Sequence, residues 1–139
     1  MALAIDILEH IEDDESAIKN LKEALKPGGY LIISTPSDLD EAAKFTSEHI
    51  RAGYHKEDLE EKLQQAGFSI IKSIFTYGTF GSLSWKLMLK LPMQITSKKL
   101  YIILPIYYLL IYPVCEILMR IDMKTDNKKG TGILIVAQS

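Results

Sequence analysis

Short apolar runs alternate along the chain with amphipathic stretches. The runs lie at residues 3–8, 30–35, 68–77 and 130–138, and their length and apolar content are typical of buried strands. The stretches at 12–26 and 56–66 repeat apolar residues every three or four positions, which indicates amphipathic helices. The order strand, helix, strand, helix, strand predicts an α/β fold with right-handed crossovers and a mainly parallel sheet.

Both helices have clear end signals. Acidic residues at 12–15 and lysines near 26 complement the dipole of the first helix. Pro27, Gly28 and Gly29 then end it, because glycine supplies a left-handed cap and proline cannot continue the helix. Gly67 is expected to cap the second helix in the same way.

Two segments are less regular. Residues 37–54 are polar, and we expect a short helix at 40–45. Residues 80–123 form a predicted helical insertion between the last two strands of one domain, 1–139, and contain a helix at 82–91. The insertion also holds sixteen residues without a charge, 100–115, which Pro105 and Pro113 interrupt.

Composition and charge narrow the function classes. The chain has 139 residues, of which 47% are hydrophobic, and a formal net charge of −2, so nothing indicates a nucleic-acid partner. Cys115 is the single cysteine and cannot form an intrachain disulfide, which favours a reducing, cytoplasmic location. The histidines at 10, 49 and 55 do not have metal-ligand spacing, so we expect no metal site.

Three segments in order carry a family resemblance. Asp6-Ile7-Leu8-Glu9-His10-Ile11 with Asp13-Asp14, then Leu25 through Ile33, then His49 through Phe68 resemble the strand-4, strand-5 and pre-strand-6 motifs of class I S-adenosylmethionine-dependent methyltransferases of type 11/12. The resemblance implies the C-terminal half of a Rossmann-like methyltransferase sheet, with strands 4, 5, 6 and 7. Residues 130–138 would be the last, antiparallel strand.

The chain departs from this family at the cofactor motif. The Gly-x-Gly-x-Gly turn and the acidic residue that binds the ribose are both missing, and the sequence starts directly at a strand, which suggests that an upstream portion is missing. Gly130-Thr131-Gly132 and Gly78-Thr79-Phe80-Gly81 are expected to be turns that open no helix. We therefore expect the chain alone to bind S-adenosylmethionine weakly and to be inactive.

Candidate site residues follow the strand ends, where ligands of open α/β sheets bind. The resemblance implies Asp6, Ile7 and Leu8 as a partial cofactor site, and His10 with Glu9 as catalytic residues. An imidazole suits a general base, although methyl transfer depends mainly on positioning. The alternative is that Glu9 and His10 only fix the entry of the helix by hydrogen bonds. The substrate-binding candidates are Ser34, Thr35, His49, Arg51 and Tyr54.

For the last group, Arg51 could hold a carboxylate or phosphate of the substrate. The alternative is a solvated loop in which Tyr54 packs on the following helix.

The apolar run at 100–115 has three interpretations. It is short for a transmembrane helix, which needs about 20 apolar residues. Its tyrosines and Lys98-Lys99 suit a membrane surface and a small hydrophobic or lipid-like substrate. It could also be a lid or core filler within a dimer.

Two function classes therefore remain. One is the substrate-side half of a methyltransferase, and the other is a non-catalytic interaction or membrane-associated module that keeps half of the fold. In both, the edge of the first strand is exposed, so we expect a homodimer or completion by another chain.

Overall fold

A computed structural model describes residues 1–39 and 50–139 of the chain. The chain divides into two compact units, Met1–Phe75 with Gly130–Ser139 and Thr76–Lys129. The predicted short helix at 40–45 lies outside the described residues. Each unit is described separately below.

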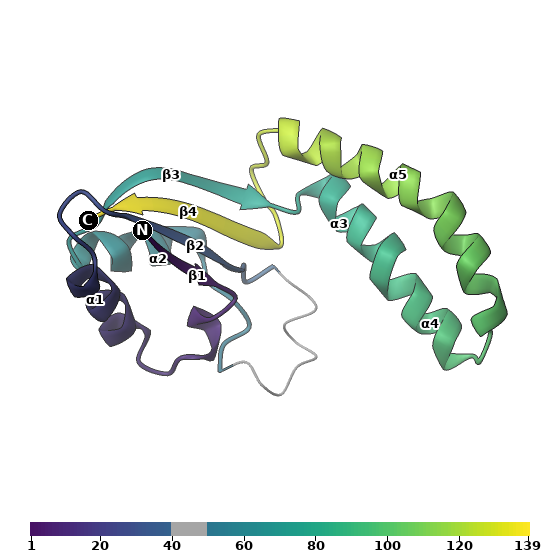
Figure 1. Cartoon of the computed structure of the whole chain (residues 1–139), viewed down its shortest axis with the longest axis horizontal. Helices are drawn as coiled ribbons and strands as arrows, with labels where there is room; N and C mark the ends of the chain where they lie inside the picture. The colour runs from purple at the N-terminus through teal and green to yellow at the C-terminus, as the bar shows by residue number, and fades with distance from the viewer. Residues whose placement is uncertain (40–49) are drawn as a thin grey trace. The chain divides into compact units, whose positions relative to one another are not determined.

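The first unit is an α/β layer structure (Figure 1). Its elements in chain order are β1 (Ala2–Ile5), the 3₁₀ turn η1 (Leu8–His10), α1 (Asp14–Ala24), β2 (Tyr30–Pro36), α2 (Lys56–Gln65), β3 (Ser69–Thr76) and β4 (Gly132–Gln138). Within the described residues of this unit, each predicted strand and helix is present, with ends within a few residues of those expected. Gly28 and Gly67 have φ of 76° and 88°, so both predicted glycine turns are left-handed.

The sheet has the order β1-β2-β4-β3. β1 runs parallel to β2, and Ala4 faces Ile33 in that register. β4 inserts between β2 and β3 and runs antiparallel to β2. The antiparallel last strand that the resemblance implied is therefore confirmed.

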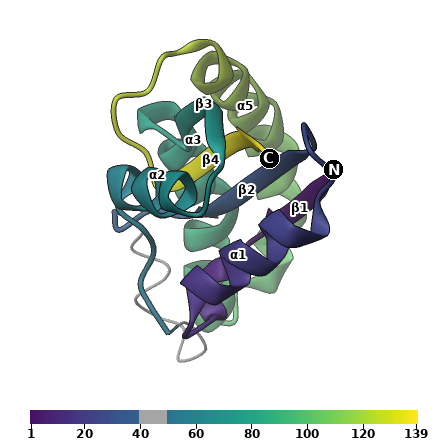
Figure 2. The same cartoon turned by 90° about the vertical axis from the view of Figure 1, so that its left-hand side faces the viewer.

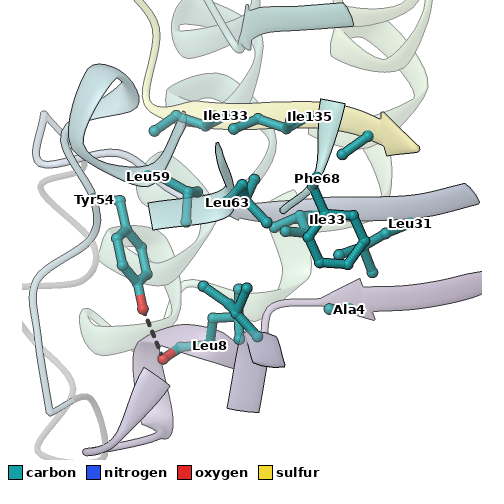
Figure 3. Packing of buried hydrophobic residues seen from close by; sticks show 12 residues of the cluster. Ala4, Leu8, Leu31, Ile33, Tyr54, Leu59, Leu63, Phe68, Ile133 and Ile135 are labelled. Atoms are coloured by element: carbon teal, nitrogen blue, oxygen red, sulfur yellow. Dashed lines mark hydrogen bonds between the residues drawn. The ribbon is translucent and has the colours of Figure 1, made fainter. Parts of the chain in front are cut away.

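One face of the sheet carries the core. Figure 2 shows α1 and α2 on the same side of the sheet. Alternate residues of the strands point toward these helices, as the pleat of a strand requires. Figure 3 shows the cluster that they form with Leu59, Leu63 and Phe68. Its buried hydrophobic members are Ala4, Leu8, Ile18, Leu31, Ile33, Tyr54, Leu59, Leu63, Phe68, Ile133, Ile135 and Ala137.

The opposite face of the same strands is much more open. Leu3 and Ile5 of β1 are 53% and 54% exposed, and Ile32, Leu134 and Val136 are half-buried. Among the residues that the structure describes, no helix of this unit packs on that face. The strands are thus apolar on both faces, as strands of a doubly covered sheet are, while the described helices of this unit cover only one.

The second unit is a helical hairpin (Figure 1). Its first arm contains α3 (Thr79–Trp85), the π-helical turn η3 (Lys86–Lys90) and α4 (Leu91–Ser97). Its second arm contains the 3₁₀ turn η4 (Tyr101–Ile103) and α5 (Leu104–Lys124). Hydrogen bonds join the arms: Ser84 Oγ donates to the Cys115 carbonyl at 3.3 Å, and Tyr107 Oη donates to the Leu87 carbonyl at 2.6 Å.

The prolines do not divide α5 as the sequence suggested. Pro105 lies in the first turn of α5, where a missing amide proton costs nothing. Pro113 lies inside the helix, so the Leu109 carbonyl has no helical amide donor, yet the helix continues to Lys124. From Leu104 onward, the apolar run therefore belongs to one helix of 21 residues.

Candidate functional site

The carboxyl end of β1 turns sharply into η1. Asp6 has φ of 49°, a left-handed conformation that aspartate tolerates better than most residues. Its amide still donates to the Ser34 carbonyl of β2 at 2.8 Å, so the turn begins while the strands are paired. Asp6 and Ile7 are exposed, whereas Leu8 is buried in the core. Of the three predicted cofactor residues, two therefore have side chains at the surface of this edge.

Glu9 is the most buried charged residue of this edge. Its side chain is fully buried, and Thr35 Oγ1 donates to Glu9 Oε2 at 3.1 Å. Within residues 1–39 and 50–139, Oε1 receives no hydrogen bond, and His10 Nε2 lies 4.0 Å from it. A carboxylate without solvent contact cannot touch a substrate in this conformation, so its geometry suits a positioning role better than the predicted catalytic one. The side chain of His10 is 37% exposed.

The segment around Tyr54 is held to the end of β2 by backbone bonds. The amide of Tyr54 donates to the Pro36 carbonyl, and the amide of Asp38 donates to the Tyr54 carbonyl, both at 3.0 Å. Gly53 has φ of 134°, and a Cβ there would overlap with the Ser37 carbonyl. Only glycine therefore lets these two backbones approach so closely.

Ser37 and Glu9 complete these connections. Ser37 is fully buried, and its Oγ donates to the Gly130 carbonyl at 2.6 Å. The Glu9 carbonyl accepts from the amides of Ile50 and Arg51, at 3.2 and 3.4 Å. Thus the loop after β1 and the loop before α2 are both fixed at the same edge of the sheet.

Arg51 and Tyr54 meet in an ionic cluster around Asp14. Arg51 donates to the Asp14 carboxylate and to the Tyr54 hydroxyl, and Lys62 Nζ lies 2.8 and 2.9 Å from the two Asp14 oxygens. The Tyr54 hydroxyl lies 2.7 Å from Asp14 Oδ2 and 3.1 Å from the Leu8 carbonyl, and Figure 3 draws the latter bond. Asp14 itself is almost fully buried.

This cluster shifts the pKa values of Asp14 and Tyr54. Burial acts to raise the pKa of Asp14, but hydrogen bonds from Lys62 and Tyr54 and the charges of Arg51 and Lys62 outweigh it, so the pKa is lowered. Burial first, and then the hydrogen bond to Asp14, raise the pKa of Tyr54. The Tyr54 phenol therefore stays protonated at neutral pH and is a poor candidate for a base.

The predicted substrate residues thus fall into different places. Thr35 is buried against Glu9, while Ser34 lies half-buried on the opposite, open face. The guanidinium of Arg51 also donates to the carbonyls of Ile11 and Glu12, at 2.9 and 3.0 Å, so its donors are used inside the protein. His49 lies outside the described residues. Asp14 and Lys62 were not predicted, because only the fold brings these two helices together with residues 51–54.

One glycine prediction was wrong. Gly78-Thr79-Phe80-Gly81 follows β3 and does open a helix, since α3 begins at Thr79. The amides of Gly78 and Gly81 donate to the buried Asp122 carboxylate, at 3.2 and 2.9 Å. An internal anion therefore already occupies the helix terminus, where a phosphate would bind in a nucleotide site.

The described residues do not make a complete cofactor site. Asp6 offers one exposed carboxylate, Glu9 and Thr35 are bound to each other, and the amides of Gly78 and Gly81 are bound to Asp122. No group in the described part of the chain takes the place of the ribose-binding carboxylate after a second strand.

Comparison with solved structures places the fold. Phosphoethanolamine N-methyltransferase 2 of Haemonchus contortus, in complex with S-adenosyl-L-methionine, is similar at 19% identity and a TM-score of 0.54, over 99% of this chain and 32% of that chain. The cyclase SpnF is similar at 17% identity and a TM-score of 0.55, over 99% of this chain and 48% of that chain. An S-adenosylmethionine-dependent methyltransferase from Mesorhizobium loti is similar at 16% identity and a TM-score of 0.52, over 99% of this chain and 60% of that chain.

These identities show a shared fold, and the chain spans about a third to three fifths of the length of the matched proteins. No curated protein matches the sequence. The family model described as a methyltransferase domain matches residues 1–73, which is more than half of the chain. The chain therefore belongs to the methyltransferase domain family, and its fold is that of S-adenosylmethionine-dependent methyltransferases.

Proposed function

We propose that the chain forms the substrate-side half of an S-adenosylmethionine-dependent methyltransferase site. The observation that carries the proposal is the position of Asp6 and Ile7, exposed at the carboxyl end of β1. Ligands of open α/β sheets bind beyond this edge. The groups that grip the rest of the cofactor come, in this proposal, from another polypeptide segment.

The chemistry asked of this chain is mainly positioning. S-adenosylmethionine supplies a methyl group on a sulfonium, and its transfer needs an acceptor held in line with that group. The bond from Thr35 to Glu9 fixes η1 against β2 and thereby places the neighbouring His10. When the acceptor is a hydroxyl, the partly exposed imidazole of His10 takes up its proton.

The substrate that we propose is small and hydrophobic or lipid-like. Support comes from the composition of the second unit, whose longest helix exposes mainly apolar side chains. One matched protein is named for phosphoethanolamine, but at 19% identity its substrate does not carry over. Fold alone also permits other chemistry, since another matched protein is named a cyclase.

Nuclear magnetic resonance with S-adenosylhomocysteine tests this function on the chain as it is. We expect weak binding that does not saturate at micromolar ligand, with amide shifts confined to Asp6–Leu8 and the end of β2. Asp6→Asn is a suitable variant, because asparagine also tolerates the left-handed backbone while the charge is lost. It should reduce the shifts and leave the rest of the spectrum unchanged.

Two outcomes would contradict the proposal in different ways. Shifts that map elsewhere, or no shifts at millimolar ligand, would refute the site at the end of β1. Saturation at micromolar ligand would refute the idea that the chain holds only part of the cofactor site.

A specific observation favours the interaction-module alternative as well. β1 is the edge strand of the described sheet and exposes Leu3 and Ile5, and such an edge invites pairing with another strand. We propose that this edge is covered by a second copy or by another chain. If light scattering finds a monomer at high concentration and amide exchange in β1 is fast, a second copy is excluded and another chain remains as the partner of this edge.

A further inference from the structure

The hairpin of the second unit uses only one side of α5 for internal packing. Leu104, Tyr107, Ile111, Cys115 and Asp122 recur at helical spacing and are half-buried or buried. They face the arm that contains α3, as the bonds from Ser84 to Cys115 and from Tyr107 to Leu87 require. The hairpin is therefore held together by one stripe of α5, and the remaining surface of this helix serves another purpose.

That remaining surface is strongly apolar. Within Tyr101–Lys124, an 18-residue window has a mean hydropathy of 2.0, and only 6% of that window is buried. Ile102, Leu109 and Leu110 are 87%, 77% and 65% exposed. An apolar surface on this scale marks a contact with a partner or a membrane.

Charge indicates which occupant fits. The second unit, 76–129, contains eight lysines and arginines and three acidic residues, a net charge of +5, whereas the rest of the chain has a net charge of −7. A second copy of the hairpin would bring a further +5 to the same contact, which repulsion opposes. Anionic lipid headgroups have the complementary charge.

The distribution of polar groups favours a position in the plane of the membrane. Glu116 and Arg120 form an exposed ion pair on α5, 2.5 Å apart, within the apolar segment. Lys86 lies near the middle of the other arm, next to Leu87, which accepts a bond from Tyr107 in the first turn of α5. Charges within both arms are costly in the hydrocarbon of a bilayer but not at the headgroups.

Pro113 also favours a position in the plane of the membrane. The carbonyl of Leu109 has no helical donor, and Leu109 is 77% exposed. An unsatisfied carbonyl is costly in the hydrocarbon core, whereas water and headgroups can bond to it at the interface. We propose that the hairpin Thr79–Lys124 docks in the plane of an anionic lipid bilayer, with the exposed apolar side of α5 in the headgroup and acyl-chain boundary and its lysines at the headgroups.

Vesicle flotation of the whole chain tests this docking. We expect the chain to float with vesicles of phosphatidylcholine mixed with an equal amount of phosphatidylglycerol, and much less with phosphatidylcholine alone. Lys98→Ala with Lys99→Ala should weaken binding to the anionic vesicles roughly thirtyfold, because each lysine near such a surface strengthens binding about fivefold. Leu109→Glu with Leu110→Glu should abolish flotation.

A matched control lies in the first unit. Ile71 is 56% exposed on β3, so Ile71→Glu places a glutamate at a similarly exposed apolar site outside the hairpin and should leave flotation unchanged. Circular dichroism of each variant verifies that it is folded.

Three results would overturn the proposal. The first is no flotation with anionic vesicles, or equal flotation of the folded Leu109→Glu, Leu110→Glu variant. The second is a dimer in solution that this variant abolishes while the parent chain does not float, which would assign the surface to a second copy. The third is resistance of bound chain to alkaline carbonate extraction, which would mean that the helix crosses the bilayer.

Discussion

The hydroxyl of Thr35 donates to the carboxylate of Glu9 at 3.1 Å, and both side chains are almost completely buried. Glu9 lies in η1, after β1, and Thr35 lies near the end of β2, so the bond holds η1 against β2. Among the described residues, Glu9 Oε1 receives no hydrogen bond, so the buried carboxylate depends on the hydrogen bond that Thr35 donates to Oε2.

Thr35→Val should therefore destabilise the first unit. The change conserves volume but leaves a buried acceptor without its donor, which costs about 1–3 kcal/mol. Thr35→Ser keeps the hydroxyl and should lose less stability. The measurement is amide hydrogen exchange of β2 near Ile33, which lies in the centre of the core.

Ser34→Val is the matched control for this pair. Ser34 is the neighbour of Thr35 on the same strand but points to the open face, so exchange should not accelerate there. If Thr35→Val and Ser34→Val behave alike, the bond from Thr35 to Glu9 contributes little to the fold.

Asp14→Asn should weaken the contact of α1 with α2 and with residues 51–54. The change removes the anion between Arg51 and Lys62 and should reduce the free energy of unfolding by about 3 kcal/mol, the lower end for a buried pair, because both cations are partly exposed. Urea unfolding followed by circular dichroism measures this. Asp13→Asn is the control, since asparagine can still accept the capping bond from the Ser16 amide.

Asp14 also makes stability depend on pH. Its pKa is lower in the folded chain than in the unfolded chain, so the unfolded state binds more protons in acid. The contribution of Asp14 is present above the ordinary aspartate pKa, near 3.9, and is lost as the pH falls through the folded value. Wild-type chain should thus lose more stability than Asp14→Asn as the pH falls below about 4. Parallel acid curves for the two would contradict this role.

Gly53→Ala tests the close approach between residues 53 and 37. The left-handed backbone alone costs about 1–3 kcal/mol for another residue, and the added Cβ would also overlap with the Ser37 carbonyl. Gly28→Ala separates the two effects, because Gly28 has φ of 76° but its nearest atom, Gln138 Nε2, is 3.8 Å away. We expect a clearly larger loss of thermal stability for Gly53→Ala, and equal losses would show that the overlap relaxes freely.

The sequence predicted best where the signals are local. Pro27 through Gly29 and Gly67 mark helix ends through backbone conformation alone, and the alternate burial of Leu31 and Ile33 follows from strand pleating. The cluster of Asp14, Arg51 and Lys62 escaped prediction, because its members are 11 to 48 residues apart and only the sheet topology brings them together.

The prediction for the glycines at the start of α3 was wrong for a related reason. Gly78 and Gly81 look like a surface turn in sequence, because the acceptor of their amides, Asp122, lies about forty residues further along the chain. The uninterrupted course of α5 through Pro113 was missed too, since packing against the other arm of the hairpin offsets the lost helical bond.

Asp122→Ala should unfold the hairpin at lower denaturant than any surface change in it. The carboxylate is buried and accepts from the amides of Gly78 and Gly81, so its removal leaves two amides of the first turn of α3 without acceptors. Hydrogen bonds to a charged group contribute about 1.5–3 kcal/mol, so we expect a loss of about 3 kcal/mol. Asp122→Asn keeps one acceptor oxygen and should lose about half as much.

Trp85, the only tryptophan of the chain, lies in α3, so its fluorescence during urea unfolding reports on this unit. The control is Asp126→Ala, because Asp126 belongs to the same unit and is exposed. An unchanged Trp85 transition in Asp122→Ala would mean that packing between the arms, rather than this internal anion, fixes the start of α3.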